Sequence, residues 1–273
     1  AYIDTAPLYG YGVGEIRVGR GIKGHRNQPA ISTKVGRLLR PGKNTEHDKF
    51  PDSDPNIEIY FDHSAAGIRR SLEESLQRLG RDSIEIVYIH DADDWISDAI
   101  NVVYPELHKM RQEGLLKAIG IGMNWCPTSV SIMKDTDLNI ALIAGRFTLL
   151  DQSAQDELYP LALKKKVSII AAGVFNSGVL ANPVDGAHYD YEPASQEILS
   201  KARAIGKYLE RYDISLPAAA LQFPLRHPAV ASVLTGAGSL SELRANIASF
   251  NIELPAGIWG DMEAAGLIAP LNL

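Results

Sequence analysis

Residues 1–10 read Ala1-Tyr2-Ile3-Asp4-Thr5-Ala6-Pro7-Leu8-Tyr9-Gly10. A short apolar run ends in the carboxylate of Asp4, a turn containing Pro7 follows, and Tyr9 comes five residues after Asp4. Glycines behind Tyr9 then lead into a helical segment. Such a segment delivers an acid and a phenol to the C-terminal end of a strand, which is where parallel α/β folds carry their chemistry.

The order of a short apolar strand followed by a helix recurs along the chain. Short continuous apolar runs are typical of parallel strands that are covered on both faces. We expect such strands at residues 2–3, 30–34, 84–89, 118–122, 140–144, 167–171 and 230–234. Helices are expected at 14–24, from the cap Ser64 to the stop Gly80, at 104–112, 128–134, 156–165 and 195–212, around Pro217, and at 241–249 and 255–265. Residues 35–62 and 173–193 are interpreted as long loops.

This alternation predicts an α/β fold of one of two kinds, a doubly wound sheet or a (β/α)8 TIM barrel. Seven βα units favour the barrel with one unit missing. The chain starts abruptly on a core strand, so we expect the missing unit to be the first. Since no repeat or break in composition divides the chain, the prediction is one barrel domain over residues 1–273, N-terminally incomplete.

The composition narrows the class of protein. Apolar residues make up 45% and charged residues 22% of the chain, as in globular proteins. The net charge of −6 argues against a nucleic-acid footprint and against a basic membrane-binding face. Cys126 is the only cysteine, so neither a disulfide framework nor a cysteine metal site is expected. We therefore expect a cytoplasmic enzyme that acts on a small-molecule substrate, with no metal ion, no nucleic acid and no membrane as partner. The oligomeric state stays open.

Four side chains at successive strand ends have the chemistry of a proton-transfer site. Asp4, Tyr9, Lys34 and His90 follow the first three strands of the expected parallel sheet, so they can converge. An ammonium beside a phenol stabilises the phenolate, and a carboxylate keeps that ammonium charged. A tyrosine held in this way can give a proton to a carbonyl oxygen or take one from an alcohol. This half-reaction suits hydride transfer.

These residues lie in motifs that resemble the catalytic tetrad of the aldo-keto reductase superfamily, and the resemblance extends over essentially the whole chain. The tetrad motifs are Asp4-Thr5-Ala6 with Tyr9-Gly10, Ser32-Thr33-Lys34, and Tyr88-Ile89-His90-Asp91. Further segments are similar to the branch of D-threo-aldose (L-fucose) dehydrogenases and pyridoxal 4-dehydrogenase: residues 7–12, 34–37, 68–76 and 175–180. The resemblance implies a (β/α)8 barrel that binds NAD(P) without a Rossmann fold. It also implies Tyr9 as general acid/base, Lys34 and Asp4 as its partners, and His90 as the residue that orients the substrate.

The same resemblance implies where the cofactor binds. Asn124 and Gln152 would contact the nicotinamide carboxamide, although Met123 stands before Asn124 where relatives often carry serine. The pyrophosphate loop would consist of Phe175, Asn176, Ser177, Gly178 and Leu180. The adenosine end would be held by Gly236, Gly238, Ser239, Glu242 and Asn246. Trp125, just past a strand end, is a candidate for the substrate pocket, with core packing as an equal alternative.

The adenosine end indicates which cofactor is preferred. Reductases that prefer NADPH carry Lys or Arg there for the 2′-phosphate, whereas this chain has Gly238 and Glu242. A carboxylate repels that phosphate and can accept from ribose hydroxyls. We therefore predict NAD as the preferred cofactor, with NADP possible.

Several alternatives compete with this interpretation. A Rossmann site at residues 10–14 lacks the full glycine pattern and the acidic ribose ligand. A metal site at residues 90–94 would draw all its ligands from one loop, so a solvated acidic loop is the better interpretation. An NADPH-dependent aldehyde reductase, or a cofactor-sensing binding module, would use the same barrel.

Overall fold

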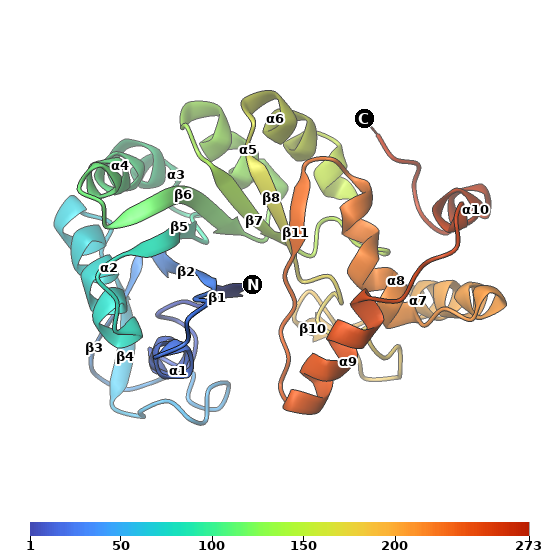
Figure 1. The fold of residues 1–273 in the computed structure, drawn as a ribbon, viewed down its shortest axis with the longest axis horizontal. Helices are drawn as coiled ribbons and strands as arrows, with labels where there is room; N and C mark the ends of the chain where they lie inside the picture. Colours follow the sequence, from blue (N-terminus) through green and yellow to red (C-terminus); the bar gives the residue numbers. More distant parts are fainter. Residues whose placement is uncertain (273) are drawn as a thin grey trace. The chain divides into compact units, whose positions relative to one another are not determined.

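The computed structural model describes residues 1–272 (Figure 1). Its contacts divide the chain into two compact units. Unit 1 contains residues 1–123 and 131–141, and unit 2 contains residues 124–130 and those from 142 onward. Within residues 1–272 no helix has the length and apolar character needed to cross a membrane.

Unit 1 is built on parallel strands that pair in the order β1, β2, β5 and β6. Their bounds are β1 Tyr2–Asp4, β2 Ala30–Val35, β5 Ile84–His90 and β6 Leu116–Met123. The register sets Asp4 level with Ser32, and Lys34 level with Tyr88. Because side chains alternate along a strand, one face of this sheet carries the polar set and the other carries an apolar one. The polar set is Tyr2, Asp4, Ser32, Lys34, Tyr88 and His90.

The helices of unit 1 are α1 (Val13–Ile22), α2 (Ala65–Leu79), α3 (Ile96–Asp98) and α4 (Tyr104–Gln112). The expected start and stop of α2 are confirmed, since the Ser64 side chain accepts from the Gly67 N–H and Gly80 ends the helix in the left-handed conformation. Helix α2 packs on β2, and α4 packs on β6.

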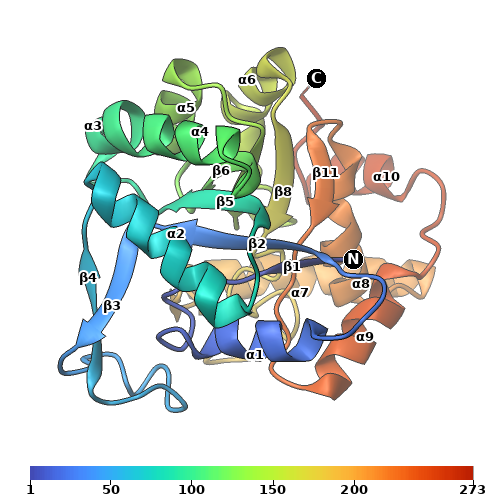
Figure 2. The ribbon, with the colours of Figure 1, turned by 60° about the vertical axis from the view of Figure 1, so that its left-hand side comes forward.

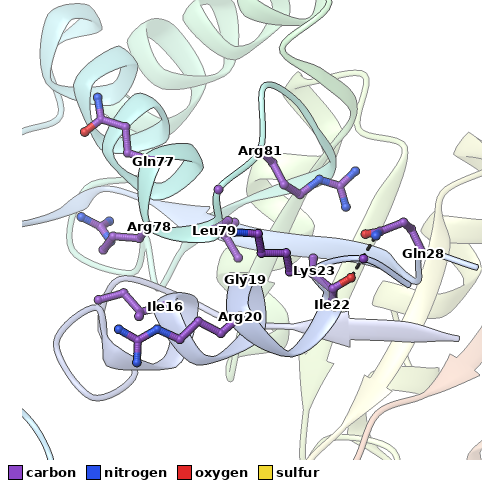
Figure 3. Close-up of a pocket in the computed structure, with 12 residues that line it drawn as sticks. Ile16, Gly19, Arg20, Ile22, Lys23, Gln28, Gln77, Arg78, Leu79 and Arg81 are labelled. Carbon is purple, nitrogen blue, oxygen red and sulfur yellow. Dashed lines mark hydrogen bonds between the residues drawn. The ribbon is translucent and has the colours of Figure 1, made fainter. Parts of the chain in front are cut away.

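Helix α1 comes very close to the backbone of α2 at Gly19. Figure 3 shows Gly19 next to Leu79, beside a pocket of about 420 Å³ that Arg20, Lys23 and Arg81 also line. A Cβ on Gly19 would overlap the backbone carbonyl of Leu79 and lie 2.9 Å from its Cα. The two helices can therefore contact each other only because residue 19 has no side chain.

A Gly19→Ala variant is expected to lower the free energy of unfolding by about 1–3 kcal/mol, because the backbone of α2 has to move. Alanine at Gly21 of the same helix meets nothing within 4 Å. Gly21→Ala should therefore raise stability by about 0.5–1 kcal/mol through helix propensity alone. Urea denaturation of both variants checks the opposite signs. Equal stability would mean that the close approach at Gly19 does not exist.

From the sequence, residues 35–62 are interpreted as one long loop, but the structure shows two strands within this segment. It contains β3 (Arg37–Pro41) and β4 (Ile57–Phe61), which form an antiparallel hairpin around a polar connection. Figure 2 shows this hairpin beside α2. The expected loop at 173–193 likewise contains a short antiparallel pair, β9 (His188–Tyr189) and β10 (Glu192–Pro193). Residues 57–61 do alternate, with Ile57, Ile59 and Phe61 separated by Glu58 and Tyr60, so this strand signal was missed. The two-residue strands β9 and β10 are too short to carry a periodic signal.

Unit 2 contains β8 (Ser168–Ala172) and β11 (Val230–Val233), which pair in parallel. Its helices are α6 (Leu158–Lys165), α7 (Gln196–Leu209), α8 (Leu216–Gln222), α9 (Leu240–Phe250) and α10 (Ile258–Ala264). Strand β7 (Ile140–Ala144) and helix α5 (Cys126–Asp135) contribute residues to both units. All seven expected strands and all nine expected helices are thus present in residues 1–272, with shifts of a few residues at their ends.

Candidate active site

The ammonium of Lys34 is the centre of the polar face of unit 1. Its Nζ donates to Asp4 Oδ2 at 2.5 Å and to the Thr5 carbonyl at 2.9 Å. The Lys34 residue is 1% exposed, so this ion pair is buried. The same Nζ lies 4.5 Å from the ring centroid of Tyr9, which is 37% exposed. The structure therefore brings together the acid, the lysine and a phenol that solutes can reach.

A chain of hydroxyl groups supports the far oxygen of Asp4. Ser32 Oγ donates to Asp4 Oδ1, and the Tyr2 hydroxyl lies 2.7 Å from Ser32 Oγ and 3.0 Å from the Tyr88 hydroxyl. Since Ser32 has one proton and gives it to the carboxylate, Tyr2 must donate to Ser32, and Tyr88 to Tyr2. Burial, then the Asp4 charge, raises the pKa of Tyr2 to about 12, and burial raises the pKa of Tyr88. Both phenols therefore stay protonated and direct their protons towards Asp4.

His90 completes the set in unit 1. Its ring meets the Tyr9 ring edge-on, with 6.2 Å between centroids. Its Nδ1 lies 2.8 Å from Arg37 Nη1, and Arg37 also forms an ion pair with Asp91 at 3.0 Å. Burial, then the charges of Lys34 and Arg37, holds the pKa of His90 well below its usual value of 6.5. The imidazole is therefore neutral at physiological pH, and it can donate a hydrogen bond without carrying charge.

Tyr9 also borders open space within unit 1. A pocket of about 310 Å³ begins at Tyr9 and Gly10 and extends along Lys49 and Phe50. Tyr9 thus borders this pocket, whereas Asp4, Lys34 and His90 do not line it.

A second pocket, of about 560 Å³, lies within unit 2. It is lined by Asn124, Trp125, Ala144, Gly145, Arg146, Gly173, Asn176, Ser177, Asp190, Tyr191 and Gly236. Arg146 organises its wall: the guanidinium donates to the Asn124 carbonyl at 2.7 Å and pairs with Asp151 and Asp190. It also lies 4.8 Å from the Trp125 ring. The Trp125 residue is 56% exposed, so of the two expected roles, pocket residue or core residue, the pocket role is favoured.

The donors and acceptors of this pocket fit a nicotinamide cofactor. Asn176 is 2% exposed and its amide nitrogen donates to the Gly145 carbonyl, but its Oδ1 has no hydrogen-bond partner within residues 1–272. A buried acceptor without a partner is costly and calls for a donor. An amide or hydroxyl of a nucleotide can supply that donor, and the Trp125 ring offers a flat apolar surface beside it. Gly145 and Gly173, both with positive φ, let the backbone approach closely.

The other residues of the expected cofactor set lie in different surroundings. Ser177 Oγ accepts from the Tyr191 N–H, and the Phe175 carbonyl accepts from the N–H groups of Gly178 and Leu180. This is a tight turn at the edge of the pocket. Gln152 does not line it, since its amide nitrogen donates to the Thr148 carbonyl and its oxygen accepts from Ala269.

The expected adenosine segment forms the start of helix α9. Ser239 accepts from the Glu242 N–H, and Glu242 accepts from the Gly238 N–H at 2.8 Å. Asn246 donates to the Gly236 carbonyl at 3.3 Å. The Ser239 bond caps the N-terminus of α9, and the other two bonds tie α9 to the segment before it. Glu242 is exposed, so its carboxylate can still face a ligand.

Sequence reasoning missed several residues of both sites. Tyr2, Ser32 and Tyr88 each stand two residues from a tetrad member, so strand alternation alone could have identified them. Arg37 lies on the missed hairpin. Arg146 and Asp190 are separated by more than forty residues, and no local pattern connects them.

Comparison with known proteins identifies the family. The profile of the Aldo/keto reductase family matches residues 1–266. The chain is 38% identical to D-threo-aldose 1-dehydrogenase of a Pseudomonas species, over 98% of this chain and 84% of that protein. It is 36% identical to pyridoxal 4-dehydrogenase of Microbacterium luteolum, with the same coverage.

A solved structure is similar as well. A holo-form aldo-keto reductase from Bacillus halodurans has a TM-score of 0.76 and 26% identity, over 98% of this chain and 82% of that one. Together with the parallel strands, this likeness supports an α/β fold of the TIM-barrel type. The chain belongs to the aldo/keto reductase family and is an NAD(P)-dependent oxidoreductase acting on CH–OH groups.

Proposed function

We propose that the chain is an NAD-preferring dehydrogenase that oxidises the hemiacetal hydroxyl of an aldose to a lactone. The observation that carries this proposal is the buried Lys34–Asp4 ion pair directly against the accessible Tyr9. Two relatives support the substrate class, because they are a D-threo-aldose 1-dehydrogenase and a pyridoxal 4-dehydrogenase. An alcohol that yields an aldehyde is the second substrate class.

Tyr9 would act as the general base in this reaction. The Lys34 ammonium stabilises the Tyr9 phenolate, which removes the proton of the substrate hydroxyl. His90 hydrogen-bonds the same substrate oxygen and orients it. As the carbon–oxygen double bond forms, the hydrogen on the carbinol carbon leaves with its electron pair. The cofactor, when bound, supplies the acceptor for that hydride.

We assign the cofactor to the pocket of unit 2. Asn124, Trp125 and Asn176 would hold the nicotinamide end, with Asn176 Oδ1 accepting from the ligand. The turn of Phe175, Ser177, Gly178 and Leu180 would follow the phosphates. Glu242 would face the adenosine ribose, with Gly236, Gly238, Ser239 and Asn246 holding the backbone in place. Gln152 would support the pocket from outside it, because its amide nitrogen and its amide oxygen both form hydrogen bonds with backbone groups.

Steady-state kinetics with NAD and NADP test this function. We expect reduction of NAD with at least one of L-fucose, D-arabinose, L-galactose and pyridoxal, and weaker use of NADP because Glu242 repels the 2′-phosphate. A preference for NADP of about tenfold, equivalent to ~1.4 kcal/mol, would contradict the assignment. In that case Arg244 of α9 is the cation to test, and an NADPH-dependent aldehyde reductase becomes the better description. Slow, single turnover with every substrate would instead favour a cofactor-sensing module.

A further inference from the structure

Arg37 makes a contact that restricts the protonation of His90. Its Nη1 lies 2.8 Å from His90 Nδ1 and 3.0 Å from Asp91 Oδ2. A guanidinium has only donors. His90 Nδ1 must therefore accept, which leaves the single proton of the neutral ring on Nε2. The Asp91 carboxylate lies 3.5 Å from Nε2 and favours a proton there as well.

The surroundings hold this guanidinium in one place. The Arg37 side chain is 16% exposed and its guanidinium carbon lies 5.6 Å from the ring centroid of Phe61, the residue opposite it in the hairpin. The Arg37 carbonyl accepts from Ser71 Oγ at 3.2 Å, which ties the start of β3 to helix α2. A side chain fixed by packing, by an ion pair and by its backbone loses little entropy when it donates to a third group.

Asp91, the other partner of Arg37, is held in an unusual backbone conformation. Its φ is +44°, in the left-handed region that non-glycine residues seldom adopt. Its N–H donates to the Gly122 carbonyl at 3.0 Å, and its own carbonyl accepts from Trp95 Nε1 at 3.1 Å. Such a conformation persists where the surrounding structure enforces it, and it is concentrated at functional sites. The strain here lies at the residue that anchors Arg37 beside His90.

We propose that Arg37 is a positioning residue that keeps His90 in the Nε2–H tautomer, so that Nε2–H is the donor presented to the substrate oxygen. The role of that donor rests on the proposed function, whereas the tautomer is a property of the chain by itself. An imidazole with its proton on Nδ1 would turn a lone pair towards the substrate oxygen and repel it. A wrong tautomer at a catalytic histidine is a known route to large losses of turnover.

The charges around His90 point the same way. The groups that face its ring are Lys34 on β2, Arg37 on β3, Asp91 after β5 and Tyr9 after β1. Two of them are cations, and both oppose a second proton on the ring. Removal of Arg37 therefore also makes protonation of His90 easier, and its pKa should rise.

Nitrogen-15 and carbon-13 NMR of histidine-labelled protein tests the tautomer without any turnover. His90 is identified among the seven histidines by the loss of its signals in His90→Gln. We expect Nε2–H in the unmodified protein, and in Arg37→Met a growing share of Nδ1–H with a raised pKa. Arg40→Met is the matched control, because Arg40 lies on the same strand with an ion pair to Glu58 and a ring contact to Tyr60. It should leave the His90 spectrum unchanged.

Kinetics provide the second measurement. With a substrate that the unmodified enzyme oxidises, Arg37→Met should lower kcat/KM by about 10- to 100-fold. Its activity should also fall at acidic pH, where His90 gains a second proton. The kcat/KM of Arg40→Met should stay within about twofold of the unmodified value. Nδ1–H in the unmodified protein would overturn the proposal, even if Arg37→Met fails to fold. An Arg37→Met variant that keeps Nε2–H would overturn it too. Failure of the proposed substrate class would leave the tautomer result unaffected.

Discussion

A Tyr9→Phe variant is expected to lose about 10²- to 10⁴-fold in kcat while it keeps its affinity for the cofactor. The Lys34 ammonium lies against the Tyr9 ring, 4.5 Å from its centroid, and the His90 ring meets the same ring edge-on. Phenylalanine retains the ring, so it preserves both contacts. The substitution removes only the hydroxyl, and with it the group that exchanges a proton with the substrate.

Steady-state turnover and cofactor titration by fluorescence measure the two quantities separately. Tyr11→Phe is the matched control, since Tyr11 is close in sequence and its hydroxyl donates to Glu46 at 3.4 Å, away from the tetrad. We expect Tyr11→Phe to keep its turnover. If Tyr9→Phe turned over at an unchanged rate, Tyr9 would have no part in the proton transfer. If it lost cofactor affinity as well, its role would be in binding.

A Lys34→Met variant is expected to lose both turnover and about 3–5 kcal/mol of the free energy of unfolding. The Asp4 side chain is only 5% exposed, and methionine would leave its carboxylate buried without a counter-charge. Ser32 would still donate to one oxygen, but a hydroxyl cannot replace an ammonium. Turnover would fall for a separate reason, because the Lys34 ammonium would no longer stabilise the Tyr9 phenolate.

The double variant Lys34→Met/Asp4→Asn separates these causes. With the carboxylate neutralised, we expect most of the stability to return in urea denaturation while turnover stays low. Lys49→Met is the control for charge alone, because Lys49 is exposed and water screens its ion pair with Glu46. A Lys34→Met variant as stable as Lys49→Met would show that the Lys34–Asp4 pair does not bear on folding.

The amino-acid sequence by itself determined the parallel strands, the helices between them and the polar residues at the strand ends. Continuous apolar runs, the Ser64 cap and the Gly80 stop are local signals, and the strands and helices they predict are present. Because the C-terminal ends of parallel strands meet at one edge, the positions of Asp4, Lys34 and His90 already indicated that they converge. The register that puts them on one face is a property of the fold. Their roles, like the missing first βα unit and the single-domain boundary, stay predictions.

Only the tertiary structure decided what surrounds those residues. The hairpin that places Arg37 against His90 joins strands separated by a polar connection, and its pairing is not encoded in either strand alone. Gln152 meets the Ala269 backbone 117 residues further along the chain, and Arg146 meets Asp190 across 44 residues. Such contacts depend on how the elements pack, because a hydrogen bond or ion pair forms between whichever groups the fold brings within reach. Local sequence determines the groups that are available, and packing determines their partners.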